Sequence, residues 1–397
     1  MSRLAILVQR CHASVVGGSE ALAVHYAQLL GEAGHEVEIL TSCAVDYLGW
    51  DNALPEGADA VEGIAVRRFA TAFPRGRPFT ELHRRLLADH AANALRPAHE
   101  RVPWRTALAE EFIRAQGPWC PGLIEHLARH ATDYAAVIGC TYLYAPTYFG
   151  LEAVPAARTA LVPTLHDEPP ACLPAYAERA EATRTLLWLT DAERNLGHTL
   201  WKIDRGHTVG MAVEAQATEP ERRTRPYFLY CGRIDASKGC RELLEAFARL
   251  READAADCEL VLTGADHLGL PRRADVVFLG HVPAARKAAL MAGCVAFVMP
   301  SPYESFSIVT LEAMAQGAPV IVNGDCVVLA GHVAAAGSGN TFHGVEDLAA
   351  RMRAALGVDE SARHAQADAA RRYVATRYGR AAVRTRLVTA LGEVLDG

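Results

Sequence analysis

The sequence lacks the features that would place the chain across a membrane or in an oxidising compartment. No apolar run reaches the ~18 residues that a membrane-spanning helix requires. The opening run MSRLAILVQ is typical of a strand that leads into a glycine turn, and it has no signal-peptide cleavage pattern. The ten cysteines include no C-x-x-C pair, which in a chain of this size indicates free thiols in a reducing compartment. We therefore expect a cytoplasmic protein.

Two cofactor motifs are also missing. The sequence contains no Asp-x-Asp pair, an arrangement that holds Mg²⁺ or Mn²⁺ against phosphate groups, so we expect no metal ion. A G-x-G-x-x-G run is absent, which argues against NAD or FAD, and we expect no cofactor. A net charge of −6 argues against a general affinity for nucleic acid, although it leaves room for a local basic patch.

The composition of the chain is typical of a soluble α/β protein. Hydrophobic residues make up 51% and charged residues 22%, which argues against a disordered chain. At 397 residues the chain exceeds the length that one hydrophobic core usually serves, so we expect two domains. The polar stretch Glu214–Arg225, followed by Pro226, is the predicted linker between them.

The first half alternates strands and helices. Leu4–Val8 is a predicted strand and Ser19–Ala33 a predicted helix. The loop between them, Val15–Glu20, contains Gly17 and Gly18, which let the backbone pass close to a ligand where the helix start offers free amides to an anion. A double glycine by itself is more often only a tight turn.

Residues 43–134 are predicted to be irregular, with helices near 80–95, 104–116 and 121–131. Arginines crowd one segment of this region and are opposed chiefly by Glu81; they are Arg67, Arg68, Arg75, Arg77, Arg84 and Arg85. A charge run of this kind is more often a solvated surface. The alternative is that Arg67–Arg85 contacts an anionic acceptor or an acidic membrane surface.

A histidine follows one of the next predicted strands. Strands are predicted at Tyr134–Cys140 and Arg158–Pro163, and His166 comes directly after the second, at the carboxyl end where open α/β sheets bind ligands. A lone histidine is more often a structural hydrogen-bonding residue, but this position favours a functional one. Asp167 and Glu168 remain open between helix-start groups and groups that contact an acceptor.

The second half begins with a strand after Pro226 that ends just before Arg233, and Lys238 precedes a predicted helix. Both side chains are therefore expected at the ligand-binding edge of a sheet. A guanidinium fork and a compact ammonium are the donors that a diphosphate requires. Two later strands end in turns that contain Gly264 and Val282.

Residues 297–324, FVMPSPYESFSIVTLEAMAQGAPVIVNG, form the centre of this half. A buried strand is predicted up to Met299, and prolines then end it. Ser305 and Ser307 are predicted N-caps of a helix that ends near Gly317, before a second apolar strand. The pattern predicts one βαβ unit of a parallel sheet.

Two carboxylates stand out in this unit. Glu304 falls in the turn at the carboxyl end of the strand. Glu312 lies four residues after Ile308 and shares the apolar face of the helix. A carboxylate there needs hydrogen-bond partners, and a ribose diol would supply two donors. The alternative, which the spacing supports equally, is that Glu312 pairs with a basic side chain.

The segment PSPYESFSIVTLEAMAQGAPVI resembles the E-x7-E signature of retaining glycosyltransferase family 4, nucleotide-sugar enzymes of the GT-B fold. The preceding G-R-x-x-x-x-K-G run and the opening G-G-S-E loop extend the resemblance over essentially the whole chain. Ser305 and Ser307 stand where the family usually has glycines, and their side chains narrow the space for a ligand. The run Asn323–His332 also departs from the family pattern and has no assigned role beyond shaping the pocket floor.

The resemblance implies an α/β protein of the GT-B class, with two Rossmann-like parallel-sheet domains facing across an interdomain cleft. It assigns residues 1–214 to an acceptor-side domain and residues 226–379 to a nucleotide-sugar-binding domain. It also implies that the last helix, 380–397, packs back on the first domain.

The resemblance further implies a role for each candidate residue. Glu304 and His166 contact the donor sugar, Glu312 contacts the ribose, and Arg233 and Lys238 bind the diphosphate. The candidate catalytic residues are therefore Glu304, His166, Arg233 and Lys238. The donor-binding set contains Arg233, Lys238, Glu304 and Glu312. Its other members are Gly17, Gly18, Gly264, Val282, Ser305, Phe306, Ser307 and Ile308.

The implied activity is transfer of a hexose from a UDP- or GDP-linked sugar to an acceptor hydroxyl, with retention at the anomeric carbon, in the synthesis of a glycan, glycolipid or glycosylated metabolite. The departing phosphate oxygen takes the acceptor proton in the family's front-face mechanism, which we favour over a covalent intermediate on Glu304. A nucleotide-sugar 2-epimerase, a sugar phosphorylase or a non-catalytic nucleotide-sugar-binding protein of the same architecture remain alternatives.

Overall fold

The computed structural model describes residues 2–14, 17–254, 257–269 and 273–395. They divide into two compact units, of which the first comprises Met1–Met211 with Val383–Gly397 and the second Ala212–Ala382. Val15 and Val16 of the predicted glycine loop lie outside the described residues, as do the last two residues of the predicted helix 380–397. Across the described ranges, no helix is both long enough and apolar enough to cross a bilayer.

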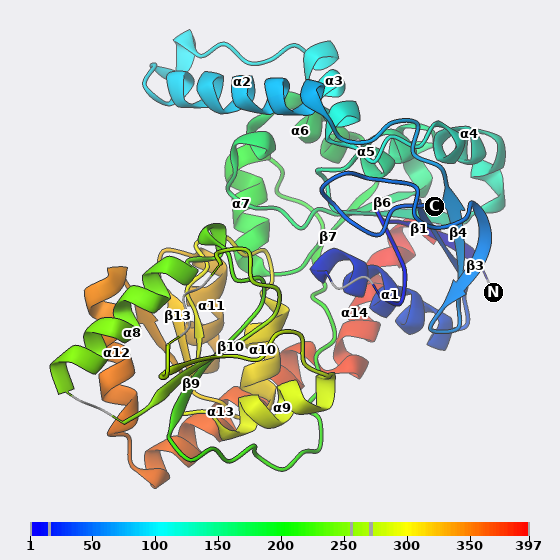
Figure 1. Cartoon of the computed structure of the whole chain (residues 1–397). Helices are drawn as coiled ribbons and strands as arrows, with labels where there is room; N and C mark the ends of the chain where they lie inside the picture. The colour runs from blue at the N-terminus through cyan, green and yellow to red at the C-terminus, as the bar shows by residue number, and fades with distance from the viewer. Residues whose placement is uncertain (1, 15–16, 255–256, 270–272, 396–397) are drawn as a thin grey trace. The chain divides into compact units, whose positions relative to one another are not determined.

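The first unit is built on an eight-stranded sheet with the order β3-β4-β2-β1-β5-β6-β7-β8 (Figure 1). Neighbouring strands run parallel, except for the antiparallel edge pair β3 and β4. The strands are β1 Arg3–Leu7, β2 Glu36–Ser42, β3 Gly57–Val61, β4 Ile64–Phe69, β5 Ala136–Cys140, β6 Thr159–Val162, β7 Thr185–Trp188 and β8 His207–Thr208.

Helices connect these strands and cover the sheet; α1 packs on β2, and α5 packs on β5. The helices of this unit are α1 Gly18–Glu32, α2 Arg77–Ala94, α3 Thr106–Gln116, α4 Pro121–His130, α5 Ala145–Glu152, α6 Pro174–Ala182, α7 Asp191–Trp201 and α14 Arg380–Leu395. The central strands β1 and β5 are almost wholly buried, because a parallel sheet is covered on both faces. Burial on both faces explains why the sequences of β1 and β5 are near-continuous apolar runs.

The hairpin of β3 and β4 corrects the prediction that residues 43–134 are irregular apart from helices. β3 reads Gly-Ala-Asp-Ala-Val and is largely exposed, so it has neither high strand propensity nor an apolar face. β4 carries Arg67 and Arg68 in its middle and pairs with β2 through the register Ile39↔Val66. Pairing with a distant strand, rather than local sequence, places this hairpin in the sheet.

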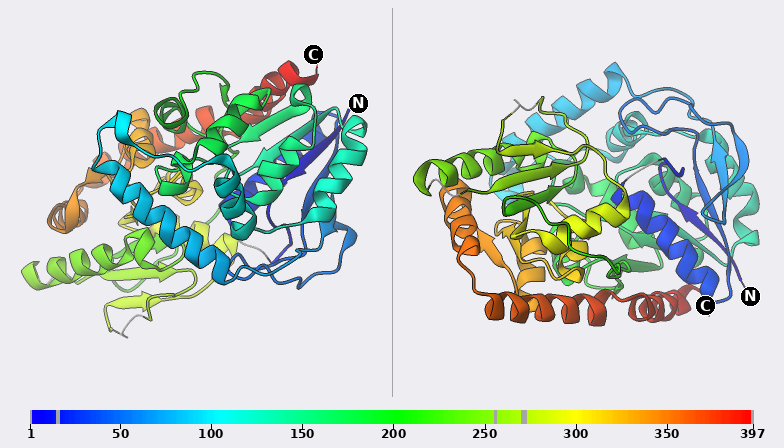
Figure 2. Two further views of the ribbon diagram at one scale, coloured as in Figure 1. Left: turned by 90° about the horizontal axis from the view of Figure 1, so that it is seen from above. Right: turned by 60° about the horizontal axis from the view of Figure 1, so that its bottom comes forward.

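The second unit is a six-stranded, wholly parallel sheet with the order β11-β10-β9-β12-β13-β14. Its strands are β9 Tyr227–Cys231, β10 Glu259–Thr263, β11 Val276–Phe278, β12 Ala296–Met299, β13 Val320–Asn323 and β14 Asn340–Phe342. Its helices are α8 Cys240–Asp254, α9 Ala284–Gly293, α10 Ile308–Ala315, α11 Val327–Ala336, α12 Gly344–Leu356 and α13 Glu360–Tyr378, with the 3-10 turn η5 at Ala236–Lys238. Helices α8 and α12 lie side by side against this sheet, as both Figure 1 and the right-hand view of Figure 2 show. The two parallel-sheet units confirm the predicted α/β fold class.

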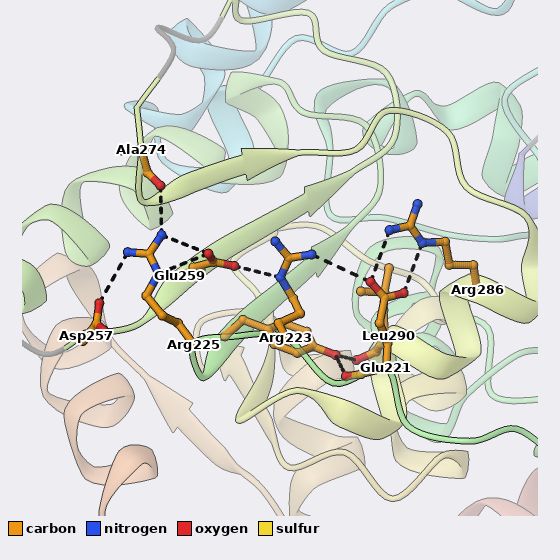
Figure 3. A network of polar contacts seen from close by, with 9 residues as sticks. Glu221, Arg223, Arg225, Asp257, Glu259, Ala274, Arg286 and Leu290 are labelled. Atoms are coloured by element: carbon orange, nitrogen blue, oxygen red, sulfur yellow. Dashed lines mark hydrogen bonds and ion pairs between the residues drawn. The ribbon is translucent and has the colours of Figure 1, made fainter.

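The predicted linker is tied to the second unit by a network of charges (Figure 3). Glu259, at the amino end of β10 and only 7% exposed, accepts hydrogen bonds from Arg223 Nε at 2.7 Å and Arg225 Nη2 at 2.9 Å. The Glu221 carboxylate accepts from Arg286 of α9 at 3.1 and 3.2 Å. Ion pairs and hydrogen bonds of charged side chains thus hold the predicted linker, Glu214–Arg225, against the second unit.

The last helix, α14, packs on elements of the first unit. Arg384 forms an ion pair with Glu32 of α1 at 3.1 Å. Glu393 pairs with His207 of β8 at 2.7 Å, and this imidazole, set against a weaker effect of burial, holds the pKa of Glu393 below its ordinary value. Residues that are distant in sequence therefore complete the first unit.

Candidate active site

The carboxyl ends of β9 and β12 bring together two of the predicted site residues. Lys238 lies in the η5 turn after β9, and Glu304 lies in the loop after β12. Their Nζ and Oε1 atoms are 2.7 Å apart, and their side chains are 26% and 15% exposed. Because β9 and β12 are neighbouring parallel strands, both loops meet at one edge of the sheet.

A glycine makes this approach possible. Gly239 follows Lys238 with a φ of 71°, in the left-handed region, and a Cβ at this position would overlap the carbonyl of Pro300. The η5 turn can therefore lie directly against the loop after β12. Asp235 fixes the start of the turn, because its carboxylate accepts from the backbone N–H of Lys238 at 3.0 Å.

Arg233 lies at the start of the same connection. Its side chain is 44% exposed, and its Nη1 is 3.7 Å from the Oδ2 atom of Asp235. The Tyr230 hydroxyl donates to the Arg233 carbonyl at 2.7 Å and fixes the backbone there. The structure thus places the predicted guanidinium and ammonium on one connection after β9, each within reach of a carboxylate.

Glu312 pairs with a basic side chain. Lys287 of α9 donates from Nζ to both carboxylate oxygens, at 2.8 and 2.7 Å, and each side chain is somewhat over a quarter exposed. The pairing anticipated as one alternative is therefore present. It leaves lone pairs on the carboxylate for further donors, so a role for Glu312 in binding a diol stays a prediction.

Lys287 is a residue that the sequence reasoning missed, although the sequence contains a signal. The chain has only three lysines, Lys202, Lys238 and Lys287, among its 40 lysine and arginine residues. Two of these three lysines pair with the two glutamates of the central unit. The scarcity of lysine could have singled out Lys287.

The loop between the two glutamates is buried and left-handed at one residue. Ser305, Phe306 and Ser307 are 8%, 5% and 5% exposed. Ser307 has a φ of 57° and a ψ of 62°, a conformation that non-glycine residues rarely adopt. Ile308 begins α10 and is half-buried.

The predicted N-caps are wrong in detail. Ser307 occupies the N-cap position of α10, but its side chain makes no capping bond to the helix amides. Its Oγ lies 2.9 Å from the Oγ1 atom of Thr310 instead. Ser305 lies too far before the helix to act as its cap. The left-handed backbone at Ser307 turns the side chain away from the usual capping geometry.

The turns that contain Gly264 and Val282 follow the next two strands. Gly264 has a φ of 121°, and a Cβ there would overlap the carbonyl of Gly232. Its amide donates to Gly280 O at 2.8 Å, so the turns after β9, β10 and β11 lie beside one another. Val282 is half-buried between β11 and α9.

In the first unit, His166 lies in the loop after β6 and is about one-third exposed. Its Nδ1 is 3.7 Å from Glu168 Oε1, which accepts a hydrogen bond from the Tyr142 hydroxyl at 2.8 Å. Burial opposes the charge of Glu168, yet the neighbouring His166 and Tyr142 together hold its pKa below the ordinary value. The roles of Asp167 and Glu168 were left open by the sequence, and the structure shows Glu168 as a partner of His166.

A second buried carboxylate supports the same loop. Glu193 of α7 has no exposed surface, and its oxygens accept from the amides of Leu165 at 2.6 Å and Leu189 at 2.5 Å. Its own amide donates to Thr190 Oγ1 at 2.9 Å, so half of a capping box is present. The carboxylate bonds to strand exits rather than to the N-cap amide. Burial raises the pKa of Glu193 to about 7, against the opposing effect of these amides.

Gly17 and Gly18 begin α1. Gly17 is its extended N-cap residue, and a Cβ there would overlap the carboxylate of Glu20. Glu20 is 5% exposed, accepts from Arg10 Nε at 2.5 Å and accepts from Gln9 Nε2 at 3.0 Å. Gly17 therefore has a packing reason to be glycine, whatever it binds.

The structure divides the arginine segment. Arg67 pairs with Glu38 at 2.9 Å, Arg68 is 1% exposed and pairs with Asp59, and Arg75 donates to the Gln116 carbonyl at 2.9 Å. These three are engaged inside the unit, which limits the proposed basic surface. The arginines on α2 remain, of which Arg77 pairs with Glu81, Arg85 pairs with Asp89, and Arg84 has no ion pair among the described residues.

No group of three or more histidine, cysteine, aspartate or glutamate side chains gathers as a metal site in the described part of the chain.

The family described as Glycosyl transferases group 1 matches residues 213–373, which contain the Lys238–Glu304 and Lys287–Glu312 pairs. An uncharacterized glycosyltransferase of Methanocaldococcus jannaschii is 38% identical over 104 residues, 24% of this chain and 26% of that protein. The D-inositol 3-phosphate glycosyltransferase of Frankia alni is 26% identical over 342 residues, 77% of each chain. Among solved structures, HepE of Anabaena in complex with UDP and glucose has a TM-score of 0.70 at 14% identity, over 99% of this chain and 100% of that one.

Proposed function

We propose that this chain, a glycosyltransferase of the GT-B fold with a Glycosyl transferases group 1 domain, is a retaining enzyme of family 4. It transfers a hexose from a nucleoside-diphosphate sugar, UDP- or GDP-linked, to an acceptor hydroxyl. The pairing of Lys238 with Glu304 carries this proposal. It joins a cation suited to a diphosphate with a carboxylate suited to sugar hydroxyls at one edge of a parallel sheet.

The proposed donor site extends along that edge. An ammonium has three N–H donors, so Lys238 can bind a phosphate oxygen while one donor stays on Glu304. Arg233 adds a planar fork for the same diphosphate. Glu312 takes the ribose hydroxyls beside Lys287, and the turns at Gly264 and Val282 border the base. The backbone of Ser305, Phe306, Ser307 and Ile308 completes the site.

The proposed chemistry balances without a protein nucleophile. The acceptor oxygen attacks C1 of the donor sugar, the bond from C1 to the phosphate oxygen breaks, and the acceptor proton passes to that departing oxygen. The sugar ring gains positive charge while the diphosphate gains negative charge. Arg233 and Lys238 stabilise the diphosphate as its charge grows. Glu304 and His166 hold the sugar hydroxyls, and retention follows from attack on the face that the diphosphate leaves.

Several finer parts of the proposal rest on the sequence. Catalysis without a metal ion or cofactor is supported by the missing Asp-x-Asp pair and by the arginine and lysine that can take over charge stabilisation. Gly17 and Gly18 lie at the start of a helix, a position suited to the donor phosphates or the acceptor. A cytoplasmic enzyme with peripheral membrane contact through Arg77, Arg84 and Arg85 remains a proposal.

A binding screen and one substitution test the donor site. UDP, GDP, UDP-glucose and GDP-mannose are compared by thermal shift, since a bound ligand raises the melting temperature by mass action. Glu304→Ala is expected to lower turnover at least ~100-fold while the nucleoside diphosphate still binds, because the proposed contact of Glu304 with the donor is to the reacting sugar and not to the diphosphate. Glu360→Ala, an exposed glutamate at the start of α13, is the matched control and is expected to behave as wild type.

Unchanged turnover in Glu304→Ala would remove that residue from the site. Absence of any shift with all four compounds would contradict the proposed donor class. Incubation of the enzyme with a nucleotide sugar alone distinguishes transfer from epimerisation, because epimerisation needs no acceptor.

A further inference from the structure

A buried histidine in the second unit holds the loop between the two glutamates. His332 of α11 is 2% exposed, and its Nε2 lies 2.9 Å from the carbonyl oxygen of Phe306. Its Nδ1 lies 2.9 Å from the hydroxyl oxygen of Tyr373 on α13. Both ring nitrogens are therefore used, and the ring connects two helices to the loop after β12.

These partners define the form of the imidazole. A carbonyl oxygen only accepts, so the proton lies on Nε2, and Nδ1 accepts from the hydroxyl of Tyr373. Burial lowers the pKa of His332 to about 4, so the ring is neutral at ordinary working pH. His332 is thus a fixed hydrogen-bond donor to the loop rather than a group that exchanges protons.

The loop needs external support because of its backbone conformation. Ser307 is a non-glycine residue at a φ of 57°, which is strained unless the surroundings impose it. The adjoining Phe306 ring packs edge-on against Tyr378, with ring centroids 5.2 Å apart, and against His332. The ring contacts hold the side chain of Phe306, and the hydrogen bond from His332 holds its carbonyl group, one residue before the left-handed Ser307.

We propose that His332 is a positioning residue, which sets the geometry of residues 304–308 for binding of the nucleoside diphosphate sugar through its hydrogen bond to Phe306. This inference rests on the proposed function. It gives a role to a segment, Asn323–His332, that departs from the family pattern. His332 does not touch the donor; it acts by holding the loop that carries Glu304 and the first amides of α10.

Three variants of the full chain test the inference. His332→Phe keeps an aromatic ring but loses both nitrogens, and we expect the Kd for UDP or GDP, whichever wild type binds, to rise about tenfold. His332→Gln retains an amide N–H that can reach the Phe306 carbonyl, and it is expected to restore much of the affinity. Tyr373→Phe removes the hydroxyl that fixes the tautomer, and an intermediate loss is expected.

Amide hydrogen exchange across residues 303–311 provides a readout that needs no ligand. Faster exchange in His332→Phe, with unchanged exchange in α8, is the expected result. Leu348→Val is the matched control, because Leu348 is fully buried on α12, a helix that packs chiefly on α8. It lowers the melting temperature without touching the loop.

Three results would overturn the inference. The first is unchanged Kd in His332→Phe, whether or not loop exchange increases. The second is an equal rise of the Kd in Leu348→Val at a comparable loss of melting temperature, which would mark the effect as global. The third is a wild-type chain that binds neither UDP nor GDP, a result that contradicts the proposed function itself and is distinguished by the wild-type measurement alone.

Discussion

Replacement of Glu193 by glutamine tests how the protonation of a fully buried carboxyl group contributes to the stability of the first unit. Glu193 accepts two short backbone hydrogen bonds, one from the amide directly before His166. Its pKa is about 7 in the folded chain, compared with an ordinary value of 4.5. Because the folded-state pKa is raised, the stabilisation is complete below about pH 4.5 and is lost as the pH rises through 7.

The size of this effect follows from the two pKa values. Each pH unit between them corresponds to about 1.4 kcal/mol, so the interval amounts to about 3 kcal/mol. Glu193→Gln is neutral at every pH and loses this dependence. It also places an NH₂ group against one of two amide donors, which costs about 1–3 kcal/mol independently of pH. The free energy of unfolding of the wild-type chain minus that of Glu193→Gln is therefore expected to decrease by about 2–3 kcal/mol from pH 5 to pH 8, and it changes sign where this decrease exceeds the pH-independent cost.

Urea unfolding of both proteins at pH 5, 6, 7 and 8, followed by tryptophan fluorescence, measures this difference. Taking the difference cancels the contributions of all other titrating groups. Glu178→Gln, an exposed glutamate on α6, is the control and is expected to give a difference near zero at each pH. If the Glu193→Gln difference stays constant across the range, the carboxylate is ionised throughout, and the amides of Leu165 and Leu189 outweigh burial.

Two further substitutions test charges of the second unit. Glu259→Gln is expected to lower the free energy of unfolding by about 2–4 kcal/mol, because it leaves Arg223 and Arg225 without the carboxylate that they share. Urea unfolding measures this loss of stability. A loss below about 0.5 kcal/mol would show that solvent screens the charge network of Figure 3. Lys287→Met is expected to change stability by less than about 1 kcal/mol, since the pair with Glu312 is partly exposed. Its affinity for UDP or GDP, measured by calorimetry, is expected to fall about tenfold as Glu312 loses its orientation, whereas tighter binding would show that Lys287 competes with the nucleotide.

Local sequence was sufficient for many of the regular elements, although not for the hairpin of β3 and β4. Apolar runs such as Leu4–Val8 and the 3.6-residue spacing of Ser19–Ala33 predicted β1 and α1 to within a residue at each end. These patterns can be recognised because a buried parallel strand appears as a short continuous apolar run, whereas an amphipathic helix repeats its apolar residues with the period of the helix. The same holds for the turn that carries Glu304, since proline cannot donate to the hydrogen-bond ladder of a central strand.

The partners of the site residues were decided only by the tertiary structure. Nothing in the sequence near Glu312 indicates that Lys287, 25 residues earlier, would donate to both of its oxygens. The hairpin of β3 and β4, the left-handed Ser307 and the bond from His332 to Phe306 are likewise set by neighbours from other elements. A hydrogen bond between distant segments depends on sheet order and helix packing, which the chain's local periods do not encode, so the sequence supplied the reactive groups and the fold supplied their pairing.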